Sequence, residues 1–324
     1  MTDKWLILKA SGGGGLGDLI KSLLVAAVYA SLTKRCLIVD WCGSVYDTDT
    51  VDIFEQLFQL ENLSTQKMLP DSDDVYPCTW KGRLNQSLHD VYIEDKWSSW
   101  QRSNVIERYS FDLSKLDYSY DVLVMWEFDQ ISKLLPFVAG VCSELEMYQY
   151  ACNKHLRLSA IFQKKLNKEL ASFSESMIGV HVRASTEFSD NKGGQLELDR
   201  YFHAVDKIAK KGRATLFLAT DNKSVQSAFK QRYKKLYSVD KWFSTPGEPL
   251  HLGGKCPDNV SNVINALLDI VLLSHCSFIV ITPQSSFSQM AEIFSKSNNH
   301  NAKIVKPSKK VFLPKLKRAL SFLK

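Results

Sequence analysis

The sequence lacks long apolar runs and any close pairing of its cysteines. No apolar stretch reaches the roughly 20 residues that a membrane-spanning helix needs. The first residues, 1–4, lead directly into a strand pattern and show no signal-peptide features. The seven cysteines contain no close Cys-x-x-Cys pair, so neither a zinc site nor a disulfide framework is expected. We therefore predict a cytoplasmic protein with reduced, mostly buried thiols.

The chain also has little excess of positive over negative charge along most of its length. The formal net charge is +6, and no nucleic-acid-binding module or basic patch with stacking aromatics is present, so we expect no nucleic-acid partner. Residues 303–324 are the exception, with eight Lys or Arg, no acid and interleaved apolar residues. This segment is either a final helix packed on the body or an amphipathic tail that contacts the inner face of a membrane.

Strand patterns alternate with helical patterns in both parts of the chain. The first part predicts a strand at 5–10, a helix at 16–32 and a strand at 36–41. The second part predicts strands at 177–183, 214–220, 235–239 and 278–282 and helices at 198–211, 223–232, 260–274 and 286–295. A helix predicted at 155–173 links the parts, whereas the polar segment 44–108 has only weak periodicity.

Such alternation indicates βαβ units and a mostly parallel sheet. A length of 324 residues favours two domains. We predict an α/β protein with two Rossmann-like domains that face each other across a cleft. Their expected bounds are 1–155 and 156–305, followed by a basic amphipathic tail at 306–324.

The loop Gly12–Gly17 follows the first predicted strand and satisfies the pattern G-x-G-x-x-G. Asp40 ends the next strand, where an NAD-binding protein places the acid that binds ribose. The glycines let the backbone approach a ligand and leave helix amides free for an anion. An NAD-dependent oxidoreductase, a nucleotide-sugar site and a tight turn without a ligand all fit this loop. No Gly-Lys-Ser/Thr follows, so it is not a Walker A loop.

Polar residues collect where the strands of the second part end. His181 and Arg183 are one residue apart on a strand and point the same way, and an arginine fork suits a phosphate. Asp221 follows the next strand, and the segment 285–287, Ser-Ser-Phe, begins a helix whose amides can seat a phosphate. Asp269 lies in an otherwise apolar helix and needs a partner. Either the N–H groups of a guanine or a neighbouring Ser or His could be that partner. For Ser285 and Ser286 the simpler alternative to phosphate binding is helix capping.

These motifs resemble those of the α1,6-fucosyltransferases, with the protein O-fucosyltransferases more distant. The resemblance covers most of 9–41 and 178–294, and 44–173 is unmatched. The length of the chain and its Pro-Leu-His loop are most similar to those of the bacterial nodulation type. The segments that carry it are Gly-Gly-Gly-Leu-Gly-Asp, Leu37–Trp41, Gly179–Arg183, Phe217–Asp221, Pro249–His251, Ala266–Ser274 and Ser285–Phe287.

The resemblance implies a GT-B fold and an inverting, metal-independent transfer of fucose from GDP-β-L-fucose to a glycan hydroxyl. The expected acceptor is N-acetylglucosamine or a related sugar, linked α1,6, in a bacterial surface glycan or oligosaccharide. No cofactor is required beyond the donor substrate. The partners are the GDP-sugar donor and the carbohydrate acceptor.

By the same resemblance, Arg183 binds the β-phosphate, while His181 and Asp269 hold ribose and guanine. Ser285 and Ser286 contact the phosphates, and Asp221 supports the site. Ala184 departs from the family, where a second basic residue usually follows the arginine. The facing loop residues Gly13, Gly14 and Gly15 and the aromatic Phe287 complete the predicted donor site.

A base must remove the acceptor proton. Glu187, four residues after Arg183, is the first candidate, and Asp190 is the alternative. The run Asp47-Thr48-Asp49 matches the Asp-x-Asp pattern of metal-dependent glycosyltransferases, but that pattern belongs to another architecture, so no metal site is predicted. A nucleotide-sugar-binding protein without catalysis remains the third hypothesis.

Overall fold

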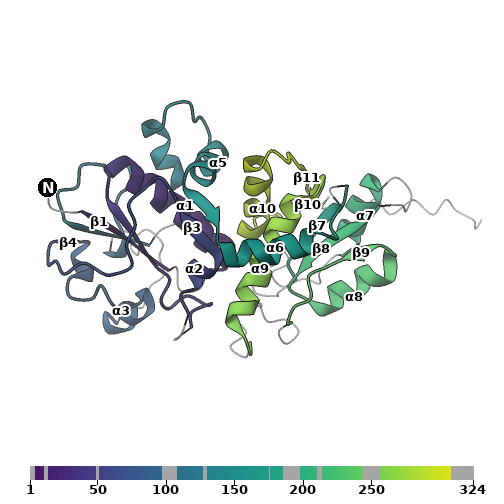
Figure 1. Ribbon diagram of the computed structural model, residues 1–324, viewed down its shortest axis with the longest axis horizontal. Helices are drawn as coiled ribbons and strands as arrows, with labels where there is room; N and C mark the ends of the chain where they lie inside the picture. The colour runs from purple at the N-terminus through teal and green to yellow at the C-terminus, as the bar shows by residue number, and fades with distance from the viewer. Residues whose placement is uncertain are drawn as a thin grey trace, which may run out of the picture.

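Two parallel β-sheets, one from each half of the chain, organise the molecule (Figure 1). The computed structural model describes residues 4–10, 14–48, 51–96, 108–126, 130–174, 176–184, 198–209, 214–243 and 256–307. The two sheets lie side by side, and helices cover their faces. The α/β class predicted from the strand and helix alternation is confirmed.

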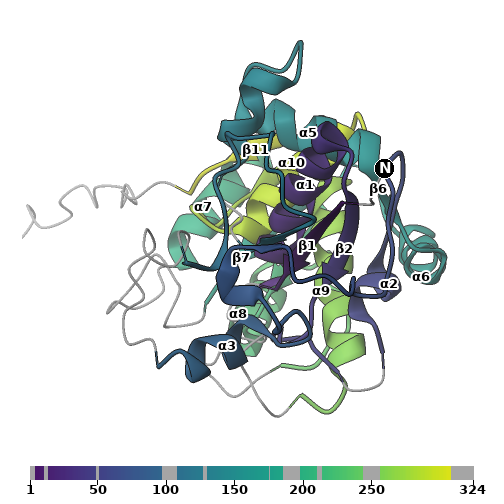
Figure 2. The ribbon, with the colours of Figure 1, turned by 90° about the vertical axis from the view of Figure 1, so that its left-hand side faces the viewer.

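The N-terminal sheet has the order β2-β1-β5-β4, and all its neighbours are parallel. Its strands are β1 (Trp5–Lys9), β2 (Cys36–Asp40), β4 (Val75–Tyr76) and β5 (Val122–Met125). Around it lie α1 (Leu16–Thr33), α2 (Ile53–Leu57), η1 (Cys78–Trp80), α3 (Leu88–Glu94), η2 (Ile131–Phe137) and α5 (Glu144–His155). Figure 2 looks onto this half, with α5 at the top and α3 near the bottom. The predicted first βαβ unit is therefore confirmed.

Helix α1 is the core helix of the N-terminal half. Asp18 in its first turn accepts a hydrogen bond from the amide of Gly15 at 3.1 Å. The C-cap residue Lys34, which follows the helix, is in the left-handed region with φ of 56°. By length and composition the helix could cross a bilayer, but 72% of it is buried inside the protein. This burial in the protein core accounts for the apolar composition of the helix.

The C-terminal sheet has the order β11-β10-β7-β8-β9 and is also parallel. Its strands are β7 (Ile178–Val182), β8 (Leu216–Thr220), β9 (Leu236–Tyr237), β10 (Phe278–Val280) and β11 (Lys303–Val305). Its helices are α7 (Leu198–Ile208), α8 (Lys223–Arg232), α9 (Asn259–Ser274) and α10 (Ser286–Ser297). Alternate strand residues face opposite helical layers. Phe217 and Ala219 share a core with α9 and α10, whereas Leu216 and Leu218 pack with α7 and α8.

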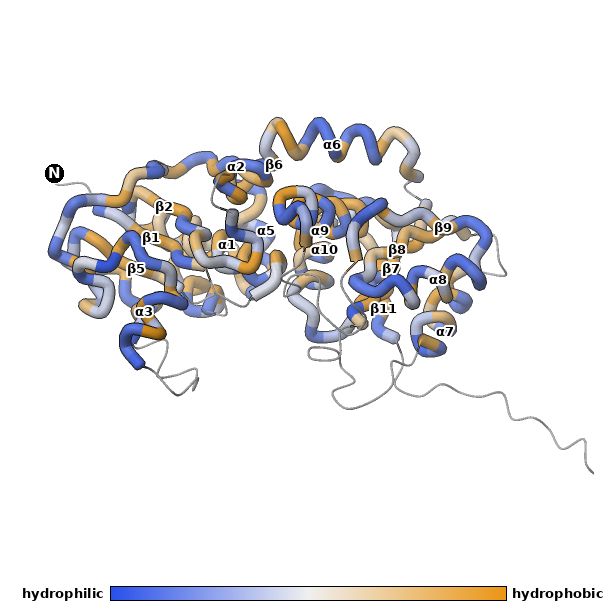
Figure 3. The backbone as a smooth tube through the Cα atoms, turned by 90° about the horizontal axis from the view of Figure 1, so that it is seen from below, coloured by the Kyte–Doolittle hydropathy of each residue, from blue (hydrophilic) through white to orange (hydrophobic). Residues whose placement is uncertain are grey.

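The halves are joined by packed helices and by a small strand pair. Helices α1, α5 and α10 belong to one apolar core that runs through both halves. The strand β3 (Phe58–Leu60) pairs with β6 (Leu156–Leu158) in antiparallel register. Helix α6 (Ala160–Leu170) follows and lies along the outside of α9, alternating apolar and polar residues (Figure 3).

Three sequence predictions of local structure are corrected. The helix predicted at 155–173 is divided, because residues 156–158 pair with β3 as a strand. Ser159 then caps α6, since its hydroxyl accepts a hydrogen bond from the amide of Phe162 at 3.1 Å. The strand predicted at 235–239 shortens to β9. Residues 303–305 start the basic segment that was predicted to be a final helix or an amphipathic tail, and they instead pair with β10 as β11, inside the predicted domain 156–305. Residues 308–324 lie outside the described residues.

Candidate active site

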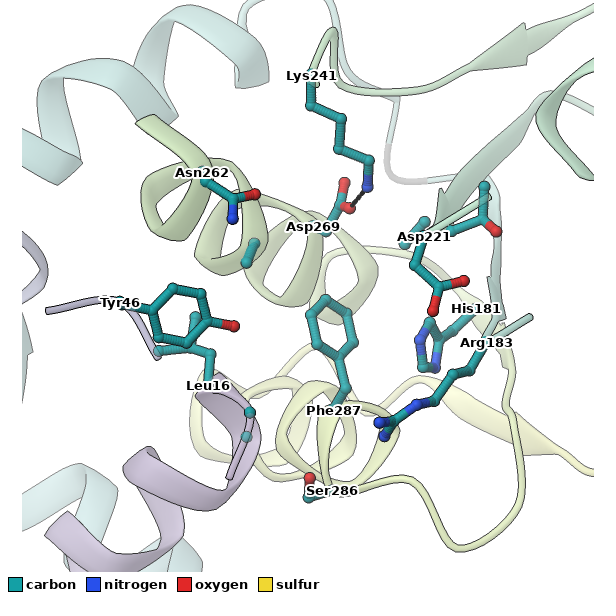
Figure 4. Close-up of a pocket in the computed structure, with 15 residues that line it drawn as sticks. Leu16, Tyr46, His181, Arg183, Asp221, Lys241, Asn262, Asp269, Ser286 and Phe287 are labelled. Atoms are coloured by element: carbon teal, nitrogen blue, oxygen red, sulfur yellow. Dashed lines mark hydrogen bonds and ion pairs between the residues drawn. The ribbon is translucent and has the colours of Figure 1, made fainter. Parts of the chain in front are cut away.

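A cavity lies between the carboxyl edge of the C-terminal sheet and the start of α1. It has a volume of about 690 Å³ including its open mouth, and α9 and α10 form much of its wall (Figure 4). Its lining residues are Gly15, Leu16, Gly17, Tyr46, His181, Arg183, Ala219, Thr220, Asp221, Lys241, Asn262, Ala266, Asp269, Ser286 and Phe287. The position agrees with the rule that open parallel sheets bind ligands beyond their carboxyl ends.

His181, at the end of β7, lines this cavity with an uncharged imidazole ring. Its ring stacks on Phe287 with centroids 4.7 Å apart, and Nδ1 lies 2.7 Å from the hydroxyl of Ser288. Burial, with the positive charges of Arg183 and Lys241, lowers the pKa of His181 to about 3. A neutral imidazole accepts at one nitrogen and donates from the other, so His181 offers a hydrogen bond rather than a charge.

Arg183 is positioned by its backbone. The Arg183 amide donates to the Thr282 hydroxyl at 3.0 Å, and that hydroxyl donates to the carbonyl of His181 at 2.9 Å. The next amide, of Ala184, donates to a carboxylate oxygen of Asp221 at 2.8 Å. These bonds join the ends of β7, β8 and β10. Figure 4 shows the guanidinium of Arg183 extending along the cavity toward Ser286.

Two helix N-termini meet beside Ser286. A Cβ placed on Gly17 would lie 2.6 Å from the carbonyl carbon of Ser286, so only glycine permits this approach of α1 to α10. The Ser286 side chain hydrogen-bonds the carboxyl of Asp18, whose pKa is raised by burial and lowered in part by that bond. The amides at both helix starts make this end of the cavity suitable for an anion.

Asp269 is paired inside the cavity. Its side chain is 2% exposed, and its Oδ2 accepts from the ammonium of Lys241, which is 7% exposed. Burial raises the pKa of Asp269, and Lys241 opposes that shift. The other carboxylate oxygen, Oδ1, has no hydrogen-bond partner among the residues that the structure describes. The predicted need for a partner is confirmed, but the partner is Lys241 rather than a Ser or His.

The geometry therefore combines a cationic end, an aromatic wall and a buried acid. Arg183 and two helix N-termini can hold a diphosphate. The stacked pair of His181 and Phe287 and the acid Asp269 can hold a nucleoside.

Comparison with known proteins agrees with this geometry. No family model matches the chain. It is 26% identical over 311 residues to nodulation protein Z of Azorhizobium caulinodans, covering 85% of each chain. The corresponding protein of Bradyrhizobium diazoefficiens is 24% identical over 310 residues, which cover 87% of this chain and 77% of the relative. The chain is a homologue of nodulation protein Z.

Solved structures show the fold. A NodZ α-1,6-fucosyltransferase soaked with GDP-fucose matches with a TM-score of 0.62 and 20% identity, over 90% of this chain and 93% of the other. POFUT1 in complex with GDP-fucose matches with a TM-score of 0.52 and 12% identity, over 96% and 99%. The predicted GT-B fold is confirmed.

The cavity brings together most of the residues predicted for the donor. Ser285 is the N-cap of α10 and is buried, but it does not line the cavity, and its hydroxyl has no partner among the described residues. Gly14 is described but does not line the cavity. Gly13, Glu187 and Asp190 lie outside the described residues. The predicted residues that do line the cavity are Gly15, His181, Arg183, Asp221, Asp269, Ser286 and Phe287.

Asp40 lies elsewhere and is already bonded. Its Oδ2 accepts from the buried ammonium of Lys9 at 2.5 Å, and its Oδ1 accepts from the amide of Cys42 at 3.1 Å. In addition, Gly17 serves helix packing. Both features speak against the NAD-binding alternative. Asp47, from the Asp-x-Asp match, accepts from the amide of Gly43 at 2.6 Å and so closes a local turn.

Lys241 and Tyr46 are the main lining residues that sequence reasoning missed. Lys241 follows the two-residue strand β9, and Tyr46 lies in a polar segment of weak periodicity. Neither position carries a spacing signal. Asp18 could have been found, because it ends the quoted Gly-Leu-Gly-Asp motif and lies in the first turn of α1.

Proposed function

We propose that the protein is an inverting fucosyltransferase that transfers L-fucose from GDP-β-L-fucose to a hydroxyl of a glycan acceptor without a metal ion. The observation that carries the proposal is the placement of Arg183 and the start of α10 at one end of a cavity whose other end holds the buried acid Asp269. Homology to nodulation protein Z supports the reaction class.

The leaving group sets the first chemical requirement. As the C1–O bond of fucose breaks, its electron pair stays on the β-phosphate of GDP. Arg183 and the amides at the start of α10 offset that developing charge, and donors already in place act without reorganisation. The Thr282 hydroxyl holds the Arg183 backbone at this position.

The acceptor sets the second requirement. Its hydroxyl oxygen forms the new bond to C1 while its proton passes to a base. Glu187 is the proposed base, with Asp190 as the alternative. Replacing Glu187 by Gln is expected to reduce turnover and to spare GDP binding. Loss of GDP binding instead would remove Glu187 from this role.

The two halves divide the substrates in this proposal. Residues 156–305 bind the donor, and 1–155 face the acceptor. A second hollow at the carboxyl edge of the N-terminal sheet supports this, because polar residues such as Asp47, Thr48 and Asn85 line it. We also propose that fucose is linked α1,6 to N-acetylglucosamine or to a related sugar of a bacterial glycan.

A single assay separates the competing functions. The protein is incubated with GDP-fucose, other nucleotide sugars or NAD, with and without N-acetylglucosamine oligosaccharides, and both free GDP and thermal unfolding are measured. The proposal expects acceptor-dependent GDP release from GDP-fucose that EDTA does not reduce. GDP affinity without sugar release would indicate a binding protein, and stabilisation by NAD alone would indicate an oxidoreductase.

The proposed location is the cytoplasm, where residues 306–324 contact the inner face of the membrane. All seven cysteines are free thiols, which suits a reducing compartment. The prediction that most of them are buried is wrong, because only Cys152 and Cys276 are buried and Cys42, Cys78 and Cys142 are exposed. Cosedimentation with anionic liposomes, with and without residues 306–324, tests the tail. Equal pelleting of the two forms would remove the membrane contact from the proposal.

A further inference from the structure

Lys241 lines the cavity, but the contacts proposed above for the donor do not include it. It projects from the segment after β9, and its ammonium pairs with Oδ2 of Asp269. Figure 4 shows this pair at the opposite end of the cavity from the guanidinium of Arg183 and from Ser286, with His181 and Phe287 between. The separation places Lys241 away from the phosphate end.

The pair presents one donor and one acceptor side by side. An ammonium has three protons, and the bond to Asp269 uses one of them. On the carboxylate, Oδ1 is buried and has no partner among the described residues. A buried acceptor of this kind is costly unless a ligand satisfies it.

A six-oxo purine matches this arrangement. Guanine carries the acceptor O6 next to the donors N1–H and N2–H₂, whereas adenine carries a donor amino group at position 6 and an acceptor at N1. A lysine beside a carboxylate therefore favours the first edge and opposes the second. The match needs Lys241 as well as Asp269, since an acid alone reads only the N–H groups.

We propose that Lys241 is a specificity-determining residue that donates to O6 of the donor's guanine while the adjacent Asp269 accepts from N1–H and N2–H₂. The inference rests on the proposed use of a GDP-sugar and adds the recognition of the base. The segment carrying Lys241 is held to α9 independently, because the Asp240 carbonyl accepts from the side chain of Asn265 at 3.5 Å.

Binding of GDP, IDP and ADP to the whole protein, measured by titration calorimetry, tests this assignment. In Lys241→Met the affinities for GDP and IDP should each fall by about 10- to 100-fold, the value of a hydrogen bond to a charged group. Affinity for ADP should change little, and the ratio of GDP to IDP should stay constant, because the 2-amino group faces Asp269.

A matched control removes one positive charge from an exposed lysine that does not contact the base. Lys234 is exposed just before β9, and Lys234→Met should leave all three affinities unchanged. An equal loss for GDP, IDP and ADP in Lys241→Met would overturn the proposal, because it would show that Lys241 only attracts the diphosphate. Unchanged GDP binding would overturn it too.

A second variant covers the case in which Lys241→Met leaves Asp269 unpaired and does not fold. Lys241→Met combined with Asp269→Asn removes both buried charges, and it should bind GDP, IDP and ADP with similar, weak affinity. A retained preference for GDP over ADP in this variant would contradict the assignment. If the wild-type protein bound no guanine nucleotide, the proposed function would fail with it; if it preferred GDP and both variants kept that preference, only the assignment of Lys241 would fail.

Discussion

The carboxyl edges of the two sheets carry similar charged residues and use them differently. At the N-terminal edge, Lys9 is 1% exposed and donates to Asp40 and to the carbonyls of Leu84 and Gln86. At the C-terminal edge, Arg183, Asp221 and the pair of Lys241 and Asp269 face a cavity. Asp40 also lines a hollow, but both of its carboxylate oxygens already accept hydrogen bonds, whereas Oδ1 of Asp269 has no partner among the residues that the structure describes. An acid at such an edge is therefore available to a ligand only where the fold leaves one of its oxygens unbonded.

The largest effect is expected from Arg183→Ala, which tests the C-terminal edge. Transfer should fall by about 100- to 1,000-fold, as for removal of a donor that offsets transition-state charge. The protein should stay folded, because the backbone bond to Thr282 does not require the side chain. Initial rates of GDP release and the thermal midpoint would be measured together. A folded variant with full activity would refute the mechanism.

Lys9→Met tests the N-terminal edge. It leaves Asp40 without its partner and should lower the free energy of unfolding by about 3–5 kcal/mol, the range for breaking a buried ion pair. Activity per folded molecule should not change, since Lys9 does not line the donor cavity. Urea denaturation measures the first quantity. Lys115→Met, at an exposed position, provides the control, and a loss of GDP binding in folded Lys9→Met would show that the edges are not separate.

Gly17→Ala tests the contact between the halves. The added methyl would collide with the backbone of Ser286 and should lower the free energy of unfolding by about 1–3 kcal/mol, as overpacking does. GDP release should slow as well, because α1 and α10 shift apart. Gly15→Ala is the matched control, since a Cβ there has no atom within 4 Å. Equal denaturation midpoints for the two variants would argue against a tight contact.

The smallest effect concerns pH. Because the pKa of His181 is lowered to about 3 in the folded protein, the unfolded chain binds a proton first as the pH falls below the ordinary value near 6.5. The contribution to stability is complete above pH 6.5 and is lost as the pH falls toward 3, by up to about 1.4 kcal/mol per pH unit. Urea denaturation at several pH values should show a shallower slope for His181→Gln than for the wild type. Parallel slopes would mean that His181 titrates normally.

Sequence patterns predicted the strand ends better than the contacts between segments. His181 and Arg183 could be paired in advance because alternation along β7 is a local property, and both do line the cavity. The same is true of Asp269, whose apolar neighbours required a buried partner. The identity of that partner depended on where the short strand β9 delivers Lys241, which no periodicity encodes.

The glycine loop shows the other limit. The pattern Gly12–Gly17 is compatible with a dinucleotide, yet the structure uses Gly17 to let two helices touch. Such a contact involves residues nearly 270 positions apart (17 and 286), and a local motif contains no information about it. The division of the predicted helix at 155–173 has the same cause, since β6 exists only because β3 lies beside it.

The abutting starts of α1 and α10 have an electrostatic consequence. Each helix start carries the equivalent of about half a positive charge, so bringing two together is unfavourable in the empty protein. The carboxyl of Asp18, bonded to Ser286, offsets part of that repulsion from within. A bound diphosphate would offset the rest, and it would thereby act as a counter-ion that holds the two halves of the molecule together.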